Sequence, residues 1–517
     1  MDFIIYPLDK DINSPNYINS RNFCKDYQVL NQLMIKSGAV LENSIAPSAV
    51  TRKESLLDKV LNDAGIGEGK KQETILNLVS DNGNLGKKGQ MLLDICFEKE
   101  DQSQEVRNGY YGRADIGAVT SRFLIHKKVY DTMDLVSDIS KALTEGGDGV
   151  DVVVLCSSFG GTGASLGVNF GEYLAKRYQE HRQRLKLHCI HIQPYFSFPD
   201  PQEKDPWKIN SHAFYAKSAS VITSFGNKKN FIRNITQDEI DNTTGKAITG
   251  NYVFDSFYYI GQEVLDSVSD RNAAEKNQEN SLHIIDMLAG MAIEDAVKRD
   301  LEAGPQIFSY FYSVTGTGTL TWEHMKDQIL FKQKHISFAR FSAFVLQVIE
   351  PLIKLNDESY VSEALILNMY GREGVFGRKC NKAKIIQGTD TELGAHLKTV
   401  IQFCRNYLTY WSQIESTTTY GQQNSGITRF FNQKEIERIL APANCLEIGR
   451  SRLRLDNLTK ADNIQSYGNN RTGIEVYNKL CSSRTLKMAA GDGKKGSEAA
   501  AVLLAEIYRQ CELPINE

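Results

Sequence analysis

The fold is decided by the stretch Val150-Asp151-Val152-Val153-Val154-Leu155-Cys156-Ser157-Ser158-Phe159-Gly160-Gly161-Thr162-Gly163-Ala164-Ser165. Its first half is a β-branched apolar run, typical of a strand covered on both faces, so we expect Val150–Cys156 to be a central strand of a sheet. Its second half is rich in glycine. Apolar residues then recur at helical spacing between Leu166 and Leu174, which predicts an amphipathic helix.

A second strand is predicted at Leu185–Ile192, where apolar residues alternate and then become continuous. Strand, helix and strand therefore follow one another within about 45 residues, which predicts a βαβ unit with parallel pairing. The fold class expected is α/β, with helices packed over a parallel sheet.

The rest of the chain predicts further strands and a helix-rich second half. The predicted elements are strands at Phe3–Leu8, Phe254–Ile260 and Ile307–Val314, and helices at Ser281–Leu301, Phe338–Ile349 (ended by Pro351) and Ser497–Cys511. A chain of 517 residues exceeds what one hydrophobic core usually fills, so we expect two main units. The region from about 330 to 517 is expected to be mainly helical.

The composition favours a globular protein of the cytoplasm. Hydrophobic residues make up 41% and charged residues 24%, with a net charge of −3, so no chain-wide basic field would attract nucleic acid. The nine cysteines are scattered and form no Cys-x-x-Cys pair, which disfavours disulfides and structural zinc. No apolar run approaches the roughly 18 residues of a membrane span, and no signal peptide is recognisable.

The glycine-rich segment predicts an anion site. A strand that leads through glycines into a helix gathers unpaired backbone N–H groups and the positive end of the helix dipole. Gly160, Gly161 and Gly163 have no Cβ to keep the backbone away from phosphate oxygens, and the hydroxyls of Ser158, Thr162 and Ser165 can add hydrogen bonds. The alternative is a glycine turn that only lets strand and helix pack closely. No lysine follows the glycines as a P-loop requires, and the spacing misses the usual dinucleotide pattern.

The segment Phe159–Ser165 resembles the glycine-rich signature of the tubulin and FtsZ superfamily, which wraps the phosphates of GTP. Phe159 and Ser165 replace the first and last glycines of that signature, with Ala164 inside it. Upstream, the segment Gly112–Gly117, which contains Asp115, is similar to the loop that contacts the γ-phosphate in the family. The resemblance implies GTP or GDP as the ligand, with Mg²⁺ as a possible companion ion.

The same resemblance implies two residues that read the base. Gln262, within Tyr259–Asp266, occupies the place of a family asparagine that contacts guanine, and Asn280 stands at the start of the predicted long helix, as a second family asparagine does. An amide both donates and accepts, so such a pair can read guanine's carbonyl and amino edge. The alternative is two surface amides, or a helix cap at Asn280.

Two family features are missing. The first glycine loop should follow Phe3–Leu8, but the residues there are Asp9–Ser14, and the only substitute is Gly83–Gln90. At the end of the long helix, the family's catalytic Asn-x-Asp loop is replaced by a segment that offers only Glu302 as a carboxylate. We therefore expect GTP hydrolysis to be slow or absent.

The resulting prediction is a tubulin-like nucleotide-binding domain at residues 1–280, a central connecting helix at 281–301 and a divergent helical domain at 302–517. Its expected partners are a purine nucleotide and further copies of the chain in an oligomer or head-to-tail filament, or another protein. A scaffold that keeps the fold without catalysis remains an alternative. A Rossmann-type dinucleotide enzyme is another, although His191-Ile192-Gln193 stands where it would need an acidic residue.

Overall fold

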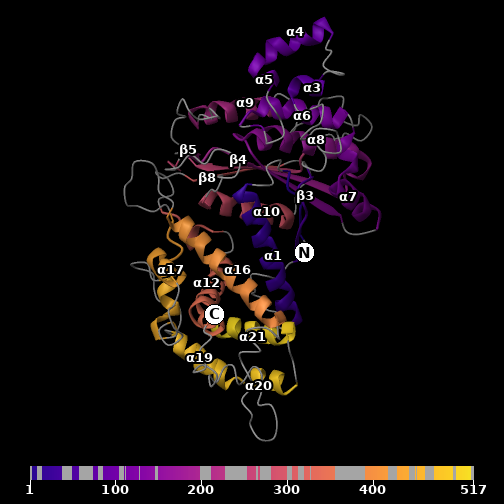
Figure 1. The fold of residues 1–517 in the computed structure, drawn as a ribbon. Coiled ribbons are helices and arrows are strands. Elements are labelled where there is room, and N and C mark those ends of the chain that lie inside the picture. The colour runs from indigo at the N-terminus through magenta and orange to yellow at the C-terminus, as the bar shows by residue number, and fades with distance from the viewer. Residues whose placement is uncertain are drawn as a thin grey trace, which may run out of the picture.

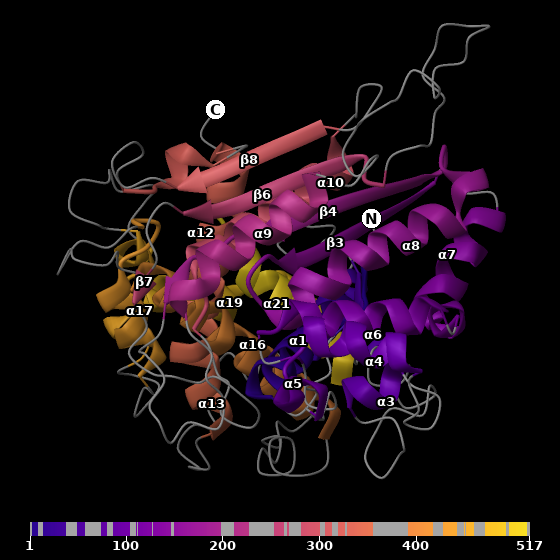
Figure 2. The ribbon, with the colours of Figure 1, turned by 90° about the horizontal axis from the view of Figure 1, so that it is seen from above.

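A parallel sheet organises the first half of the chain. The computed structural model describes residues 3–8, 14–37, 49–56, 74–79, 86–103, 110, 112–126, 128–145, 149–197, 211–226, 253–262, 266–267, 281–299, 306–312, 319–325, 328–354, 391–416, 428–441, 449, 451–459, 471–492 and 496–513. The four strands of the sheet are β3 (Val150–Ser157), β4 (Leu185–Ile192), β6 (Ser256–Gln262) and β8 (Gln306–Tyr312). They lie in the order β3-β4-β6-β8 and every pairing is parallel (Figure 2). The expected α/β class with a parallel sheet is confirmed.

The strand β3 does not occupy the place expected for it. Among the described strands it is at one edge of the sheet, and Leu155 is half exposed. The buried central strands are β4 and β6, in each of which six residues are buried. The prediction of a central position for Val150–Cys156 was wrong because an apolar run also suits a strand with its two faces covered and one side unpaired.

Helices cover both faces of the sheet. On one face α6 (Ala114–His126), α7 (Asp134–Thr144) and α8 (Val168–Arg177) share a core with β3 and β4. On the other face α10 (Ile284–Lys298) packs against β3, β4 and β6. In Figure 1 α6 and α8 lie above the strands, and α10 lies below them. The predicted helix at Ser281–Leu301 is therefore present within those bounds.

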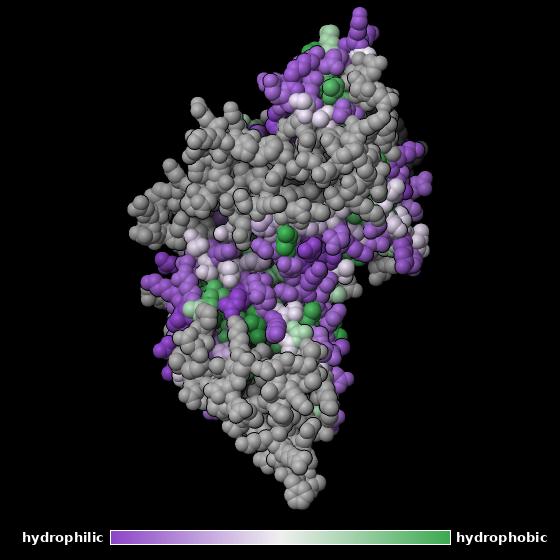
Figure 3. All heavy atoms as spheres, viewed as in Figure 1, coloured by the Kyte–Doolittle hydropathy of each residue, from purple (hydrophilic) through white to green (hydrophobic). Residues whose placement is uncertain are grey.

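Smaller elements surround this sheet. They are β1 (Phe3–Ile5), which pairs in parallel with β2 (Val50–Arg52), β5 (Phe196–Ser197), which pairs with β7 (Asp266–Ser267), α3 (Ile75–Val79), α4 (Lys87–Cys96), α5 (Lys99–Ser103) and α9 (Phe214–Gly226). Of the two places considered for a first glycine loop, 9–13 lies outside the described residues, and Lys87–Gln90 begins α4. This helix lies at the upper end of the molecule in Figure 1 and exposes Met91, Leu92 and Ile95. In Figure 3 hydrophobic residues reach the surface at the same end.

The second half of the chain is helical, as expected. Its main helices are α12 (Gln328–Phe344), α13 (Glu350–Lys354), α16 (Thr391–Glu415), α17 (Gln433–Leu440), α19 (Gly473–Ser482), α20 (Arg484–Gly491) and α21 (Gly496–Cys511). The helix that starts at Gln328 does not end at Pro351, because the wider π-turn η8 (Val345–Ile349) carries the chain into α13. A proline ring would clash with the carbonyl four residues earlier in a regular α-helix, and a local change of helix type relieves that clash.

The N-terminal helix α1 (Pro15–Lys36) packs with these C-terminal helices. Leu30, Leu33 and Met34 are buried in the core that α16 and α21 share with α12 and α10. At its end, Lys36 Nζ donates a hydrogen bond to Ser497 Oγ at 3.0 Å. The two halves of the chain are thus joined through α1, and the division at residues 280 and 301 stays a prediction.

None of the helices in the described ranges is long and apolar enough to cross a lipid bilayer.

Candidate functional site

The glycine-rich segment lies at the carboxyl end of β3. The chain bends at Ser158–Gly160, becomes helical at Gly161, and continues through the π-turn η2 (Gly163–Gly167) into α8. The first hydrogen bond of this helical segment runs from Ala164 N to Gly160 O at 3.3 Å. The N–H groups of Gly161, Thr162 and Gly163 therefore precede the helical ladder, which is the arrangement that favours an anion.

The two predicted phosphate segments touch each other. An added Cβ on Gly161 would lie 3.2 Å from Gly112 N and 2.7 Å from the Cβ of Tyr110, so the backbone of the glycine segment packs directly on the loop that begins α6. Gly112 has a φ of +74°, a conformation that favours glycine. The structure thus brings together Gly112, Asp115 and Gly160–Ser165, which lie far apart in sequence.

At two of the three glycines, close packing within the protein is enough to explain why no larger residue is present, and no ligand is needed. An added Cβ on Gly163 would stand 2.6 Å from Ser157 N, and that on Gly161 would meet Tyr110. Gly160 differs, because its added Cβ would meet only the rotatable Ser157 Oγ, at 2.9 Å. Gly160 is therefore the glycine whose missing side chain the packing explains least.

Two of the three predicted hydroxyl ligands point into the protein. Ser158 Oγ is fully buried and lies 2.7 Å from Ser218 Oγ and 3.1 Å from Ile192 O. Ser165 Oγ donates to Gly161 O at 2.6 Å, and Ala164 beside it is buried. The Thr162 hydroxyl has no hydrogen-bond partner among the described residues, so it is the one that a ligand could use.

An aromatic cluster, which the sequence did not indicate as a unit, adjoins the glycine segment. The Phe159 ring is buried and lies 5.1 Å from the ring of Phe214, 5.6 Å from Phe196 and 6.1 Å from Tyr195 between ring centroids. The side chain that replaces the first glycine of the family signature thus packs among three rings from two other segments. Burial of these rings fixes the glycine segment against α9 and the chain after β4.

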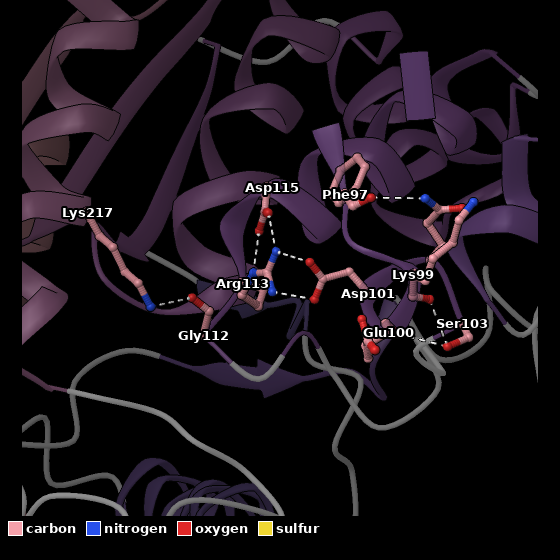
Figure 4. Close-up of polar contacts among 10 residues, drawn as sticks. Phe97, Lys99, Glu100, Asp101, Ser103, Gly112, Arg113, Asp115 and Lys217 are labelled. Carbon is pink, nitrogen blue, oxygen red and sulfur yellow. Dashed lines mark hydrogen bonds and ion pairs between the residues drawn. The ribbon is translucent and has the colours of Figure 1, made fainter. Parts of the chain in front are cut away.

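Charged side chains surround the Gly112 loop (Figure 4). Arg113 binds both oxygens of Asp101, at 2.6 and 2.9 Å, and both oxygens of Asp115, at 3.1 and 2.7 Å. Burial alone would raise the pKa of Asp115, but the hydrogen bonds and charge of Arg113 hold it below its usual value. Because Arg113 occupies both oxygens, Asp115 is not a ready ligand for a metal ion.

Sequence reasoning also missed Lys217. It comes from α9, and its Nζ donates to Gly112 O at 3.1 Å (Figure 4). No sequence motif around Lys217 predicted this contact, because only the folded structure brings α9 next to the Gly112 loop.

The predicted base-reading residues are only partly described. Gln262 is 3% exposed at the carboxyl end of β6, and its Nε2 donates to Tyr195 O at 2.7 Å. Its Oε1 is buried without a hydrogen-bond partner, which leaves one acceptor available. Asn280 and the candidate carboxylate Glu302 both lie outside the described residues.

A hydrogen-bonded series of a serine, a histidine and an aspartate crosses the sheet near the amino ends of β3 and β6. Ser256 Oγ lies 2.7 Å from His188 Nδ1, and His188 Nε2 lies 3.0 Å from Asp151 Oδ1. Ser256 is fully buried and His188 is 1% exposed, so a substrate cannot reach the hydroxyl. These hydrogen bonds therefore link the start of β3, the middle of β4 and the start of β6, and the three residues are not a nucleophilic site.

Within the described ranges, no group of three or more His, Cys, Asp or Glu residues is arranged to hold a metal ion. A comparison with known protein families, curated proteins and solved structures finds no match for this chain.

Proposed function

We propose that this chain binds a purine nucleotide, GTP before others, with its phosphates on the glycine segment Gly160–Ser165. The observation that supports this most is the contact between Gly161 and the Gly112 loop, which joins two separately predicted phosphate segments at the carboxyl end of a parallel strand. Ligands of open parallel sheets bind at that edge. The tubulin-like character, the oligomer or filament, and the Mg²⁺ ion belong to the same proposal.

The unpaired acceptor of Gln262 supports guanine as the base. A buried oxygen without a partner is unfavourable, and guanine offers donors on its N1 and N2 edge where adenine does not. Slow or absent hydrolysis is also proposed, and phosphate release from GTP across a range of protein concentrations tests it. Fast release that rises with concentration and is lost in Glu302→Ala would contradict it.

The phosphate site is tested best at Gly160. Valine at Gly161 or Gly163 would collide with the protein's own backbone, so loss of binding there would not distinguish a ligand contact from a damaged loop. Gly160→Ala requires only a rotation of Ser157, and we propose that its methyl group keeps phosphate oxygens away from the N–H groups of this segment. We expect GTP affinity to fall roughly 10- to 150-fold, the equivalent of one hydrogen bond to a charged group, in calorimetric titration.

The matched control is Gly290→Ala in α10, where an added Cβ meets nothing within 4 Å. It should leave GTP binding unchanged and raise the free energy of unfolding by about 0.5–1 kcal/mol. Binding that is equal in Gly160→Ala and wild type would remove the glycine segment from the site, and absence of binding in the wild type would overturn the proposed function.

A second candidate function is a scaffold that keeps this fold and acts through partners. The packing of Gly161, Gly163 and Phe159 favours it, because their neighbours within the protein explain them fully. Failure of the wild type to bind GTP, GDP or ATP would favour this candidate.

A further inference from the structure

The first turns of α9 lie against both phosphate segments. Ser218 Oγ is 2.7 Å from Ser158 Oγ, and the Phe214 ring packs on Phe159 of the glycine segment. Lys217 stands between these two contacts and reaches Gly112 O instead (Figure 4). The side chain is therefore held at the junction of the two segments by the residues on either side of it.

The charge of Lys217 is not matched by an anion of its own. The nearby carboxylates Asp101 and Asp115 are both bound by Arg113, and no carboxylate of the described residues forms an ion pair with Lys217. Burial lowers the pKa of Lys217, as does the neighbouring charge of Arg113, while Asp115 offsets this in part. Lys217 is a partly buried ammonium whose one partner among the described residues is a neutral carbonyl, so an arriving anion would stabilise its charged form.

We propose that Lys217 binds the terminal phosphate of the nucleotide, an inference that rests on the proposed function. An ammonium has three donors, and Gly112 O uses one of them, so Lys217 can keep this bond and donate to a phosphate oxygen as well. Gly112 lies directly beside Gly161, where the N–H groups of the glycine segment begin. Lys217 thereby supplies at this site a positive charge that the glycine segment itself lacks.

A purely structural role would give a different result. If Lys217 only held the Gly112 turn in place, its loss would weaken GTP and GDP alike and would lower thermal stability. If it binds the terminal phosphate, its loss weakens the triphosphate far more than the diphosphate.

The experiment is calorimetric titration of GTP and GDP into wild type, Lys217→Met and Lys217→Arg. Lys217→Met keeps the apolar stem and removes the charge, and we expect GTP to bind roughly 10- to 150-fold more weakly, with GDP changed about threefold or less. Lys217→Arg should retain most of the affinity. The control Lys176→Met removes the same charge from an exposed lysine of α8 that pairs with Glu172 and should bind both nucleotides like the wild type.

The outcomes separate this inference from the proposed function. Wild type that binds GTP, with Lys217→Met equal to it or weakened equally for GTP and GDP, would overturn the role of Lys217 and leave the site standing. Wild type that binds neither nucleotide would overturn both. Melting temperatures confirm that each variant is folded. If Lys217→Met is not folded, a Lys217→Arg that keeps the affinity for GTP or weakens GTP more than GDP supports the role, while one that weakens GTP and GDP equally contradicts it.

Discussion

Gln262 has a buried side-chain oxygen, Oε1, without a hydrogen-bond partner, and this oxygen is the basis for the proposed base selectivity. If guanine fills the place of its missing partner, Gln262→Ala should weaken GTP by roughly 5- to 150-fold, because an unsatisfied buried group costs on the order of 1–3 kcal/mol. ATP should be weakened less, and the wild type should prefer GTP. Titration of both nucleotides into wild type and variant measures this.

Gln333 offers a matched control for that substitution. It is equally buried in α12, donates from Nε2 to Leu513 O at 2.8 Å, and also has a buried Oε1 without a partner. Gln333→Ala should therefore cost similar stability and leave nucleotide affinity unchanged. Equal affinity of the wild type for GTP and ATP would remove Gln262 from the base site and leave the glycine segment untouched.

At the residue scale the sequence predicted which side chains gather, but not where they point. Gly112, Asp115 and the glycine segment are adjacent, as the resemblance implied. The hydroxyls of Ser158 and Ser165 were expected at phosphate and instead bond to Ser218 and to Gly161 O. Their partners come from residues that no local pattern connects to them, and for that reason Lys217 was missed as well.

At the element scale, the end of α16 contains a carboxylate that should make stability depend on pH. Glu415 is buried and accepts hydrogen bonds from Phe430 N at 2.7 Å and Phe431 N at 2.9 Å. Burial raises its pKa from 4.5 to about 7, with these bonds opposing the change. Between pH 4.5 and 7 the folded chain keeps a proton that the unfolded chain has lost, so the free energy of unfolding falls as the pH rises.

The variant Glu415→Gln isolates this effect, because glutamine keeps an acceptor for the two N–H groups and does not titrate. Urea unfolding at pH 4.5, 5.5 and 7 should show a decrease in the wild type that exceeds the variant's by on the order of 3 kcal/mol. The same pH dependence in both proteins would show that folding leaves the pKa of Glu415 unchanged.

The bounds of elements with a strong local pattern were predicted closely, whereas the pairing of β3 within the sheet and the continuation of a helix past a proline were not. Leu185–Ile192 and the C-terminal helix, predicted at Ser497–Cys511, were found almost as expected, since alternation and helical spacing are properties of short windows. The edge position of β3 and the helix that continues past Pro351 depend on pairing and helix geometry beyond such windows.

At the scale of the whole molecule, the first helix stabilises the last ones. Leu30 of α1 is fully buried in the C-terminal core, so Leu30→Ala should lower the free energy of unfolding by about 2–5 kcal/mol. Trp322 and Trp411 are buried in that core and report on it by fluorescence, in a Trp207→Phe background. The control Ile35→Ala alters an exposed residue of the same helix and should change stability by less than about 0.5 kcal/mol. A tryptophan transition that Leu30→Ala leaves in place would show that the C-terminal helices fold without α1.

Lys36 and Ser497 are in contact although 461 residues separate them in sequence. On the ribosome, Lys36 is therefore synthesised long before its partner. At a synthesis rate of about 5–20 residues per second, roughly 20 to 90 seconds separate the two residues. During that interval the apolar face of α1, with Leu30, Leu33 and Met34, has emerged before the helices that will cover it. We expect this face to stay exposed on the nascent chain until then, and a chaperone that binds short apolar helices during translation should bind there.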